Sequence, residues 1–463
     1  MVVIPQVGDV LGEHGSTDGR APIDMAWLAE QVREPSARGI AATVTRLVRN
    51  GDIATGSRMP AVRDLAVVLR VSPATVSAAW GLLRTQNVIE GRGRQGSWIV
   101  DVISSPRPKR FETIGTYWSK DVLDLSLAIP DPALLPDLGA AIARSVPGAN
   151  FNTYEREVIT PALAAAAAAQ WPFVAERFLV TNGGYEGLRL LLSSMLVPGD
   201  YVAVADPSAP RIIDILEHVG ARIVPVVMDA QGPVPASLRR AMSRQPVIFF
   251  YEPRASSRLG ISVTPTRRDD LATILRGTET IVLEDDGAGE IAVAPYSGIG
   301  AVLPEQTVLV KSYSKSHGPD LRIAIVGGRA ESVERARAIL QFGAAWTSRV
   351  LQDALAVMLT DDAVTAQVSA VREVYRHRRD SMIARLTNRG VTVMGGNDGL
   401  SIAVRVANEH QALLVLASHG IAADAISTAS VASPTPMVRL GIGLELERPD
   451  FVADAYALAS RAV

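Results

Sequence analysis

The chain has 463 residues, of which 48% are hydrophobic, 20% charged and 5% aromatic. This composition is typical of a globular protein with two or three domains, and it excludes a mainly disordered chain. The chain contains no Cys, which excludes disulfides, thiolate metal sites and a cysteine nucleophile, and its six His show no metal-ligand spacing. The formal net charge of −2 is unevenly divided, because residues 34–100 hold nine Arg against four acidic residues and the rest of the chain carries −7.

Residues 1–24 contain Gly and Pro without a sustained hydrophobic period, so we expect a flexible N-terminal arm. The first residues lack the basic segment followed by an apolar core that marks a secretory signal. No apolar run in the chain approaches the roughly 20 residues that a bilayer-spanning helix needs. We therefore expect a cytoplasmic protein without a membrane partner.

Residues 25–102 predict a small basic domain. Helical patterns extend to about Asn87, and the run VIEGRGRQGSWIV that follows contains two β-prone segments around a Gly/Arg turn, which is typical of a hairpin. A positive module on an acidic body is what binding to the phosphates of DNA requires. The charge alone is equally compatible with an ordinary solvated surface.

Within this domain, the residues around Ser72 predict two helices separated by a tight turn. The first helix, Ala61–Arg70, is amphipathic, and the chain turns at Val71. Ser72 suits the N-cap of the second helix, with Pro73 in its first turn. One face of the second helix is apolar: Val76, Ala79, Trp80 and Leu83. The opposite face carries small residues that suit a DNA major groove: Ala74, Thr75, Ser77 and Ala78.

The tip of the predicted hairpin, with Arg92 and Arg94, is suited to contact the DNA backbone or the minor groove. Over about 65 residues, the order of helix, turn, recognition helix and Gly-rich wing resembles the GntR-type winged helix-turn-helix, an α+β fold. The resemblance implies double-stranded DNA as the partner and these DNA-facing positions: Arg63, Ser72, Ala74, Thr75, Ser77, Arg92 and Gly96. The alternative is a basic helical domain with another role. Pro73 and Ala74 stand where the family often has longer polar residues, which implies fewer base contacts and more readout of DNA shape.

Residues 103–120 include SSPRPKR and show no apolar period, so we predict a domain boundary near residue 102 followed by a linker. From residue 121 onward, apolar β-prone runs alternate with amphipathic helical runs. This alternation predicts an α/β domain, residues 121–463, with a mostly parallel sheet that helices cover on both faces. A long helical pattern from Ala363 to Asn388 begins a smaller α+β subdomain, about residues 363–463.

The run VLVKSYSKSHGPDLRIAIVGG places Lys315 just after a predicted strand, where a side chain can point into a ligand crevice. Ser312 precedes it by three residues and Arg322 follows it by seven, and a hydroxyl and a guanidinium both suit a phosphate. A surface lysine is the ordinary alternative. The segment resembles the Schiff-base lysine motif of fold-type I aminotransferases, and especially of MocR-like regulators, in which a GntR-type head precedes an aminotransferase-like domain. The resemblance covers about residues 34–463 and implies pyridoxal 5'-phosphate as the cofactor.

Further residues of that family's site have counterparts in this chain. Asp285 matches the carboxylate that keeps the pyridine nitrogen protonated, although the neighbouring Asp286 leaves the position open by one residue. The resemblance also implies that Tyr154 approaches the lysine and that Arg439 binds an amino-acid carboxylate. A strand-to-helix junction offers backbone N–H groups to a phosphate or is a plain tight turn: Gly183, Gly184 and Tyr185.

Three positions depart from the aminotransferase pattern around the cofactor ring. Ala209 stands where an aromatic residue usually stacks on the ring, and Ser257 stands where an Asn usually bonds the ring oxygen. Gly287 replaces an expected Tyr or His. These changes weaken the expectation of transamination more than the expectation of cofactor binding, because turnover needs a preorganised site.

Three functions therefore remain open. The first is a homodimeric transcription regulator whose aminotransferase-like domain responds to pyridoxal phosphate, an amino acid or a related effector. The second is an active aminotransferase with an accessory DNA-binding head. The third is a regulator whose large domain no longer binds the cofactor and acts in dimerisation.

Overall fold

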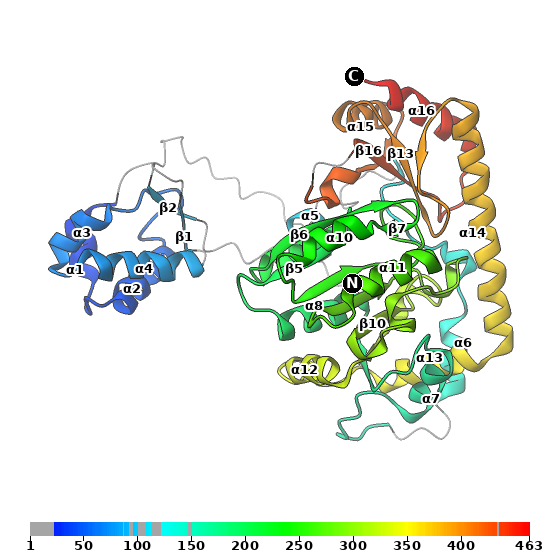
Figure 1. Ribbon diagram of the computed structural model, residues 1–463, viewed down its shortest axis with the longest axis horizontal. Helices are drawn as coiled ribbons and strands as arrows, with labels where there is room; N and C mark the ends of the chain where they lie inside the picture. Colours follow the sequence, from blue (N-terminus) through cyan, green and yellow to red (C-terminus); the bar gives the residue numbers. More distant parts are fainter. Residues whose placement is uncertain are drawn as a thin grey trace, which may run out of the picture. The chain divides into compact units, whose positions relative to one another are not determined.

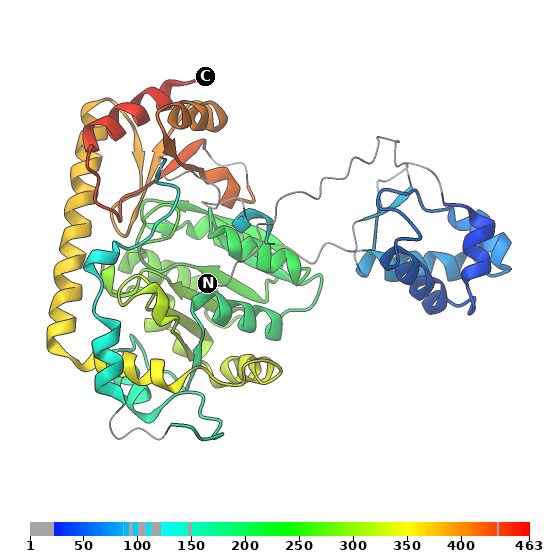
Figure 2. The ribbon, with the colours of Figure 1, turned by 180° about the vertical axis from the view of Figure 1, so that it is seen from behind.

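The computed structural model describes residues 23–86, 88–91, 96–100, 108–112, 122–146, 151–432 and 435–463. The chain divides into two compact units, Met1–Arg107 and Pro108–Val463 (Figures 1 and 2). The expected arm, residues 1–22 in particular, lies outside the described residues. No single described helix is long and apolar enough to cross a membrane, and two sharply bent helix pairs pass that test only by length and composition.

The N-terminal unit is a helical domain with a small hairpin. Its elements are α1 (Met25–Gln31), α2 (Ala37–Arg49), α3 (Val62–Leu69), α4 (Pro73–Thr85), β1 (Ile89–Gly91) and β2 (Ser97–Ile99). The two strands pair in antiparallel fashion. Arg70 adopts a left-handed conformation and ends α3, and the Ser72 hydroxyl caps α4 by accepting a bond from the Thr75 N–H at 3.1 Å. The first predicted helix thus occurs within one residue of its expected ends, and the second begins directly after its expected cap, Ser72.

An eight-stranded mixed sheet forms the centre of the C-terminal unit, with helices on both faces (Figures 1 and 2). In spatial order its strands are β4 (Arg177–Thr181), β11 (Ala324–Gly328), β10 (Thr307–Ser312), β9 (Ile281–Asp286), β8 (Ile248–Tyr251), β5 (Tyr201–Asp206), β6 (Arg222–Asp229) and β7 (Gly232–Pro233). The run from β10 through β9, β8 and β5 to β6 is parallel, whereas β11 and β7 are antiparallel to their neighbours. The central strands β8, β9 and β10 are buried along their whole length, which explains the apolar runs in their sequences, whereas β6 is partly exposed.

Two layers of helices cover this sheet. One hydrophobic cluster packs strand residues such as Val204 and Leu283 against α8 (Gly184–Met195), α9 (Pro210–His218) and α12 (Ala330–Leu340). Alternate strand residues such as Ala203 and Val282 pack on the other face against α10 (Pro235–Met242) and α11 (Pro265–Leu275). The remaining helices of this part are α6 (Leu138–Ser145), α7 (Pro161–Gln170) and α13 (Arg349–Thr360). Short 3-10 turns join these elements: η2 (Pro132–Leu134), η3 (Gly289–Ile291), η4 (Ile299–Ala301), η5 (Pro304–Gln306) and η6 (Pro319–Leu321).

The long helix α14 (Asp362–Asn388) leads to a small subdomain (Figure 1). This subdomain contains a four-stranded sheet in the order β12 (Val393–Met394), β13 (Ser401–Arg405), β16 (Met437–Gly441) and β15 (Asp424–Ala425). Its other elements are α15 (Glu409–Ser418), η7 (Ile426–Ala429) and α16 (Pro449–Arg461). The strand β3 (Leu123–Asp124) pairs with β14 (Ile421–Ala422), so the start of the large domain is joined to the small subdomain.

A short helix occurs inside the segment that the sequence predicts as a linker. This helix, α5 (Lys109–Glu112), belongs to the C-terminal unit and packs on α9. The backbone N–H of Arg110 donates to Asp214 at 3.1 Å, and the Arg110 guanidinium pairs with Asp214 at 3.0 Å and with Glu217 at 2.7 Å. These charged contacts join residues about 100 positions apart in the sequence. They explain why α5, which lacks an apolar period, still packs at a defined position on α9.

Candidate functional site

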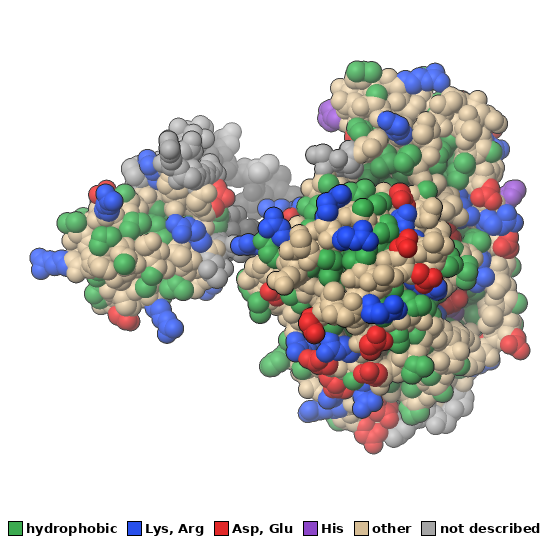
Figure 3. All heavy atoms as spheres, viewed as in Figure 1, with side chains coloured by type: hydrophobic (Ala, Val, Ile, Leu, Met, Phe, Trp, Pro, Cys, Tyr) green, Lys and Arg blue, Asp and Glu red, His purple; other side chains and the backbone are tan. Residues whose placement is uncertain are grey.

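The exposed face of α4 carries the residues that the sequence predicts to meet DNA. Its buried face consists of Val76, Ala79, Trp80 and Leu83, as the helical period predicts. Ser72, Ala74 and Ser77 are exposed, Thr75 is half-buried, and Arg63 is exposed on α3. Arg side chains lie at several places on the visible face of this unit, which contains no lysine (Figure 3). The structure therefore brings the predicted contact positions of α3 and α4 to the surface.

The described part of the hairpin adds one cation that sequence reasoning missed. Arg58 forms an isolated β-bridge with Trp98, and its guanidinium lies 5.9 Å from the centroid of the Trp98 ring. Gly96 has a φ of 104°, and a Cβ placed there would lie 3.5 Å from the Arg58 Nε. Arg58 is exposed, so it adds a positive charge beside the wing. Arg92 and Arg94 lie outside the described residues.

The C-terminal unit contains a cavity of about 260 Å³ at the carboxyl ends of the parallel strands, where ligands of such sheets bind. It is lined by Gly184, Tyr185, Arg211, Glu252, Ser257, Asp285, Gly287, Ser312, Ser314, Lys315 and Arg322. Most of the positions that the sequence singles out therefore come together from five separate segments. The cavity is mixed in charge, which suits a small polar ligand more than an apolar one.

One end of the cavity has the features of a phosphate cradle. Gly183 adopts φ 91° and ψ 163°, a conformation open almost only to glycine, and a Cβ there would lie 3.2 Å from the Arg322 Nη2. Arg322 is held in place because its Nη2 donates to the Asn182 carbonyl at 3.1 Å. The hydroxyls of Ser312 and Ser314 lie 2.8 Å apart beside the N-terminus of α8. A guanidinium, hydroxyls and the N-terminal N–H groups of a helix are the groups that bind phosphate.

At the opposite end, Asp285 and not Asp286 lines the cavity. Asp286 is bound by Arg254, with contacts of 3.0 and 2.7 Å, and also accepts a bond from the Gly289 N–H at 3.1 Å. Of the two neighbouring carboxylates that the sequence leaves open, Asp285 is therefore the one that faces the cavity. Burial raises the pKa of Asp285 well above its usual value, and Glu252 raises it further while Lys315 opposes the shift. A ring nitrogen that carries a proton would supply the positive partner that Asp285 favours.

Lys315 lies near this carboxylate with open space between them. A Cβ at Gly287 would lie 3.7 Å from the Lys315 Nζ and 3.8 Å from one Asp285 carboxylate oxygen. Gly287 therefore leaves room at a place where a larger side chain would narrow the cavity. The buried Ser257 side chain also lines the cavity, next to Glu252.

Three residues of the cavity were not among the predicted site residues: Glu252, Arg211 and Ser314, whose hydroxyl lies beside that of Ser312. Glu252 is buried, accepts a bond from the Ser257 N–H at 2.6 Å, and has a raised pKa chiefly because of its burial. The Arg211 guanidinium lies 4.2 Å from the centroid of the Tyr185 ring, a cation–π contact worth about 0.5 to 2 kcal/mol. Two features of the sequence could have indicated Glu252 and Arg211. Glu252 directly follows the buried strand β8, and Arg211 lies at the start of α9.

Arg439 and Tyr154 do not line the cavity in this chain. Arg439 is buried in β16, donates to the Ser257 carbonyl at 3.4 Å, and has a pKa lowered to about 10 by burial and by the nearby Arg258. It thus contacts the backbone of Ser257, which lines the cavity. Tyr154 is 90% exposed and lies edge-on to Trp346, with ring centroids 6.4 Å apart.

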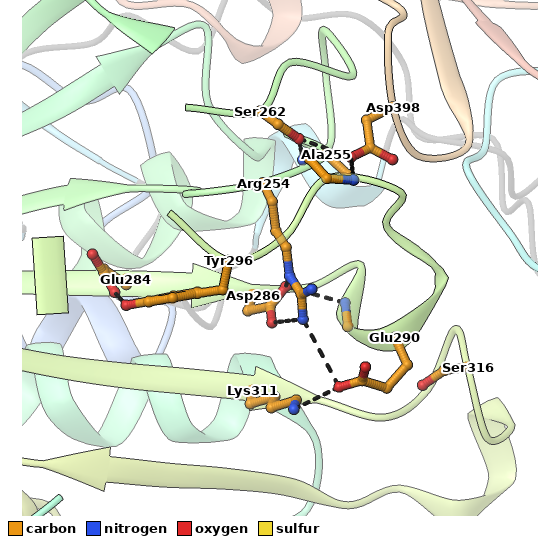
Figure 4. Close-up of polar contacts among 12 residues, drawn as sticks. Arg254, Ala255, Ser262, Glu284, Asp286, Glu290, Tyr296, Lys311, Ser316 and Asp398 are labelled. Atoms are coloured by element: carbon orange, nitrogen blue, oxygen red, sulfur yellow. Dashed lines mark hydrogen bonds and ion pairs between the residues drawn. The ribbon is translucent and has the colours of Figure 1, made fainter. Parts of the chain in front are cut away.

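A buried polar network supports the cavity from the next layer (Figure 4). Lys311 pairs with Glu290 at 2.6 Å, and Glu290 also lies 3.9 Å from Arg254. Burial alone would raise the pKa of Glu290, but Lys311 and Arg254 hold it below its usual value. Figure 4 also shows Glu284, which accepts a bond from the Tyr296 hydroxyl. Glu284 accepts a second bond from the Tyr251 hydroxyl. These contacts hold the ends of β9 and β10, and with them Asp285 and Ser312, in a fixed arrangement.

Two family models match the chain. Aminotransferase class I and II matches residues 120–454, and the gntR family of bacterial regulatory proteins matches residues 36–99. The vitamin B6 salvage pathway transcriptional repressor PtsJ of Salmonella typhimurium is 31% identical over 371 residues, which are 79% of this chain and 84% of that protein. The pyridoxine biosynthesis regulator PdxR of Corynebacterium glutamicum is 26% identical over 401 residues, 83% of this chain and 86% of that one.

The fold also matches solved aminotransferases. The α-aminoadipate aminotransferase LysN of Thermus thermophilus, solved with N-(5'-phosphopyridoxyl)-L-leucine, superimposes with a TM-score of 0.67 at 20% identity, over 76% of this chain and 95% of that one. The predicted fold class, a winged helix-turn-helix followed by a fold-type I domain, is confirmed.

The chain is a DNA-binding transcription regulator with an aminotransferase-like domain. More narrowly, it belongs to the aminotransferase class I and II family and, through its gntR-type head, to the MocR-like regulators. This membership implies a pyridoxal phosphate site, and the cavity fits that group, because it offers a lysine, a carboxylate and a phosphate cradle in one place.

Proposed function

We propose that the aminotransferase-like domain is the sensor of this regulator and that pyridoxal phosphate in the cavity alters how the heads bind DNA. The observation that carries the proposal is the meeting of Lys315, Asp285 and Arg322 in one cavity of a chain that also has a DNA-binding domain. Occupancy controls DNA binding only if the ligand has different affinities for two arrangements of the protein.

Each group in the cavity has a proposed task. Arg322, Ser312 and the N–H groups of Gly184 and Tyr185 hold the phosphate, and Asp285 keeps a proton on the ring nitrogen. When bound, pyridoxal phosphate supplies an aldehyde that reacts with amines and a ring that withdraws electrons. Lys315 is the amine of this chain that reaches the aldehyde.

An amino acid is a candidate second effector. Arg439 keeps a positive charge beside the cavity wall despite its burial, and an arginine binds a carboxylate with two hydrogen bonds. The names of the two bacterial relatives point to the genes of vitamin B6 supply. We therefore propose that this protein regulates such genes in the cytoplasm and that it senses the concentration of pyridoxal phosphate.

We also propose a homodimer. Tyr154 is nearly fully exposed in the single chain. In proteins with the fold-type I fold, residues of a second subunit commonly complete the site. Tyr154 of one copy would then approach Lys315 of the other. Two heads in one dimer would read a repeated or palindromic DNA site. Light scattering at micromolar concentration, with and without DNA, tests this, and a monomer under both conditions contradicts it.

The experiment for the sensor compares the wild-type protein with Lys315→Ala. Addition of pyridoxal phosphate to the wild type gives a new visible absorbance band that Lys315→Ala lacks, and it changes the affinity for DNA. A wild-type spectrum equal to that of free pyridoxal phosphate would contradict the proposed site. An unchanged DNA affinity, with the band present, would contradict the sensor role alone.

For the head, we propose that α4 enters the major groove with Ser72, Ala74, Thr75 and Ser77, while Arg63 and Gly96 contact the backbone. Arg92 and Arg94 of the wing bind phosphates. Arg92→Ala and Arg94→Ala then weaken binding to all sequences and flatten the dependence of affinity on salt. Wild-type binding by both variants at several salt concentrations would overturn the wing assignment.

A further inference from the structure

The cavity lacks an aromatic residue at the position where aminotransferases place one over the ring. Ala209 occupies that position, serves as the N-cap residue of α9, and is 1% exposed. Ala209 is not among the described residues that line the cavity. A flat ring bound by the phosphate cradle and Asp285 therefore needs another surface to pack on.

Tyr185 is the one aromatic residue among the described residues that line the cavity. It is the second residue of α8, so its backbone belongs to the phosphate end. Its side chain lines the same cavity as Asp285 and Glu252. Burial and these two acids raise the pKa of Tyr185, while Arg211 and Arg439 oppose this shift. The Tyr185 ring is therefore an aromatic surface inside the cavity that a pyridine ring would occupy.

Arg211 lies against the ring of this phenol and also lines the cavity. It is the second residue of α9, two positions beyond Ala209, and its guanidinium lies 4.2 Å from the Tyr185 ring centroid. A guanidinium over one face of an aromatic ring leaves the opposite face for another flat group. Arg211 is partly buried, so its position depends on the protein and not only on solvent.

We propose that the Tyr185 ring, backed by Arg211, is the surface on which the flat ring of a phosphorylated pyridine ligand packs, in place of the missing aromatic residue at position 209. This inference deepens the proposed function and rests on it, because it concerns the same site. It makes Tyr185 a specificity residue through its side chain, whereas the family pattern uses only its backbone.

The test uses pyridoxamine phosphate, which has no aldehyde and therefore reports ring and phosphate binding without a bond to Lys315. Dissociation constants are measured by calorimetry for the wild type, Tyr185→Ala and Tyr185→Phe, with inorganic phosphate as a second probe. Tyr185→Ala weakens pyridoxamine phosphate about tenfold, the size expected for a lost aromatic pair, and leaves inorganic phosphate unchanged. Tyr185→Phe, which keeps the ring, stays within about twofold of the wild type, and Arg211→Met lies between the two.

A matched control is Tyr201→Ala, because Tyr201 also lies beside an arginine, Arg222, at 5.6 Å, but outside the cavity. This variant binds pyridoxamine phosphate like the wild type. Unchanged or tighter binding by Tyr185→Ala would overturn the inference, since the phenol would then be neutral or would block the ring. A wild type that binds neither pyridoxamine phosphate nor pyridoxal phosphate would instead overturn the proposed function itself.

A separate observation concerns the contact between α5 and α9. Asp214 and Glu217, which bind Arg110 of α5, lie one and two turns beyond Arg211 on the same helix. Helix α9 therefore has its first turn at the cavity and its later turns against the segment that leads, in sequence, toward the DNA-binding domain. We infer that this ion-paired contact is a latch through which occupancy of the cavity is passed to the linker.

The latch is tested in the full chain with Arg110→Ala and, as the control, Arg144→Ala, which removes another arginine from an ion pair with an aspartate, Asp361. The measured quantity is the ratio of DNA dissociation constants with and without pyridoxal phosphate. Arg110→Ala brings this ratio close to one while cofactor affinity stays within about twofold, and Arg144→Ala keeps the wild-type ratio. A wild-type ratio in Arg110→Ala would overturn the latch, and a wild-type protein with a ratio of one would overturn the sensor role as well.

Discussion

The two ends of the cofactor cavity differ in how closely they follow an aminotransferase. At the phosphate end, Gly183, Ser312 and Arg322 lie together as the family pattern implies. At the ring end, Ser257 and Gly287 line the cavity in place of larger groups, and an additional buried acid is present. The difference indicates that such a domain can retain the residues that bind the cofactor's phosphate group while the residues around the ring change. Binding depends mainly on the phosphate group, whereas turnover also requires that the reacting atoms be held in a fixed geometry.

The largest effect is expected from Arg322→Ala, which removes the guanidinium of the phosphate end. Loss of charged hydrogen bonds costs about 1.5 to 3 kcal/mol, which is roughly a 10- to 150-fold loss in affinity. Pyridoxal phosphate and inorganic phosphate are both affected, because both use the cradle. Calorimetric titration measures this, with Arg335→Ala on the exposed surface of α12 as the control. An affinity within threefold of the wild type would show that the cradle is misassigned.

Turnover is expected to be slow because the ring end is altered. Across a panel of amino acids and keto acids, the wild-type protein should form new amino acid at well below about 1 per second, whereas enzymes have a median near 10 per second. A coupled assay under multiple-turnover conditions measures the rate. Sustained production at 1 per second or faster would remove the distinction between the two ends and favour the active aminotransferase.

Sequence reasoning performs best where structure is local. The Ser72 cap and the buried face of α4 follow from neighbouring residues, and the helix occurs where the pattern predicts it. The choice between Asp285 and Asp286 was open because it depends on Arg254, which is about 30 residues away. Contacts across different strands and helices carry no local period, so a sequence alone does not reveal them.

The same limit applies to the ring end and to the linker. The resemblance predicted Tyr185 only through its backbone, since the contact of its ring with Arg211 joins two helices. The docking of Arg110 on α9 was not expected, because a polar run with Pro resembles a plain linker. The wing remains a sequence prediction at Arg92 and Arg94, which lie outside the described residues.

The acids of the ring end should destabilise the protein in the absence of cofactor. Burial raises the pKa values of both Asp285 and Glu252, so the folded state holds their protons more tightly than the unfolded state. Stability therefore falls as pH rises above the usual carboxyl range toward the raised values. Asp285→Asn and Glu252→Gln remove this loss, and each should stabilise the cofactor-free protein at pH 8 by about 1 to 3 kcal/mol.

The pH dependence is the sharper part of that prediction. The gain from either variant should be smaller at pH 5 than at pH 8, because the wild-type acids are more protonated at the lower pH. Thermal melts at the two pH values measure the difference. Variants that melt below the wild type at pH 8 would indicate that the ionised acids stabilise the empty cavity.

A matched pair of glycines, one at each end of the cavity, includes the smallest expected effect, that of Gly287→Ala. Gly183 has the φ of 91° that disfavours any side chain, and its Cβ would press on Arg322. Gly287 lacks such a φ, and its Cβ would have only ordinary contacts of 3.7 Å or more. Gly183→Ala should therefore destabilise the protein by about 1 to 3 kcal/mol, and Gly287→Ala should stabilise it by about 0.4 to 1 kcal/mol through the unfolded chain.

The same pair should separate the two ends in ligand binding. Gly183→Ala weakens inorganic phosphate, because the added methyl group displaces the guanidinium that binds it. Gly287→Ala leaves inorganic phosphate unchanged, since its methyl group lies between Lys315 and Asp285 at the other end. Thermal melts and phosphate titrations of both variants measure the contrast. If Gly287→Ala weakened phosphate binding as much as Gly183→Ala does, the cavity would act as one undivided site. The distinction between a retained phosphate end and an altered ring end would then be wrong.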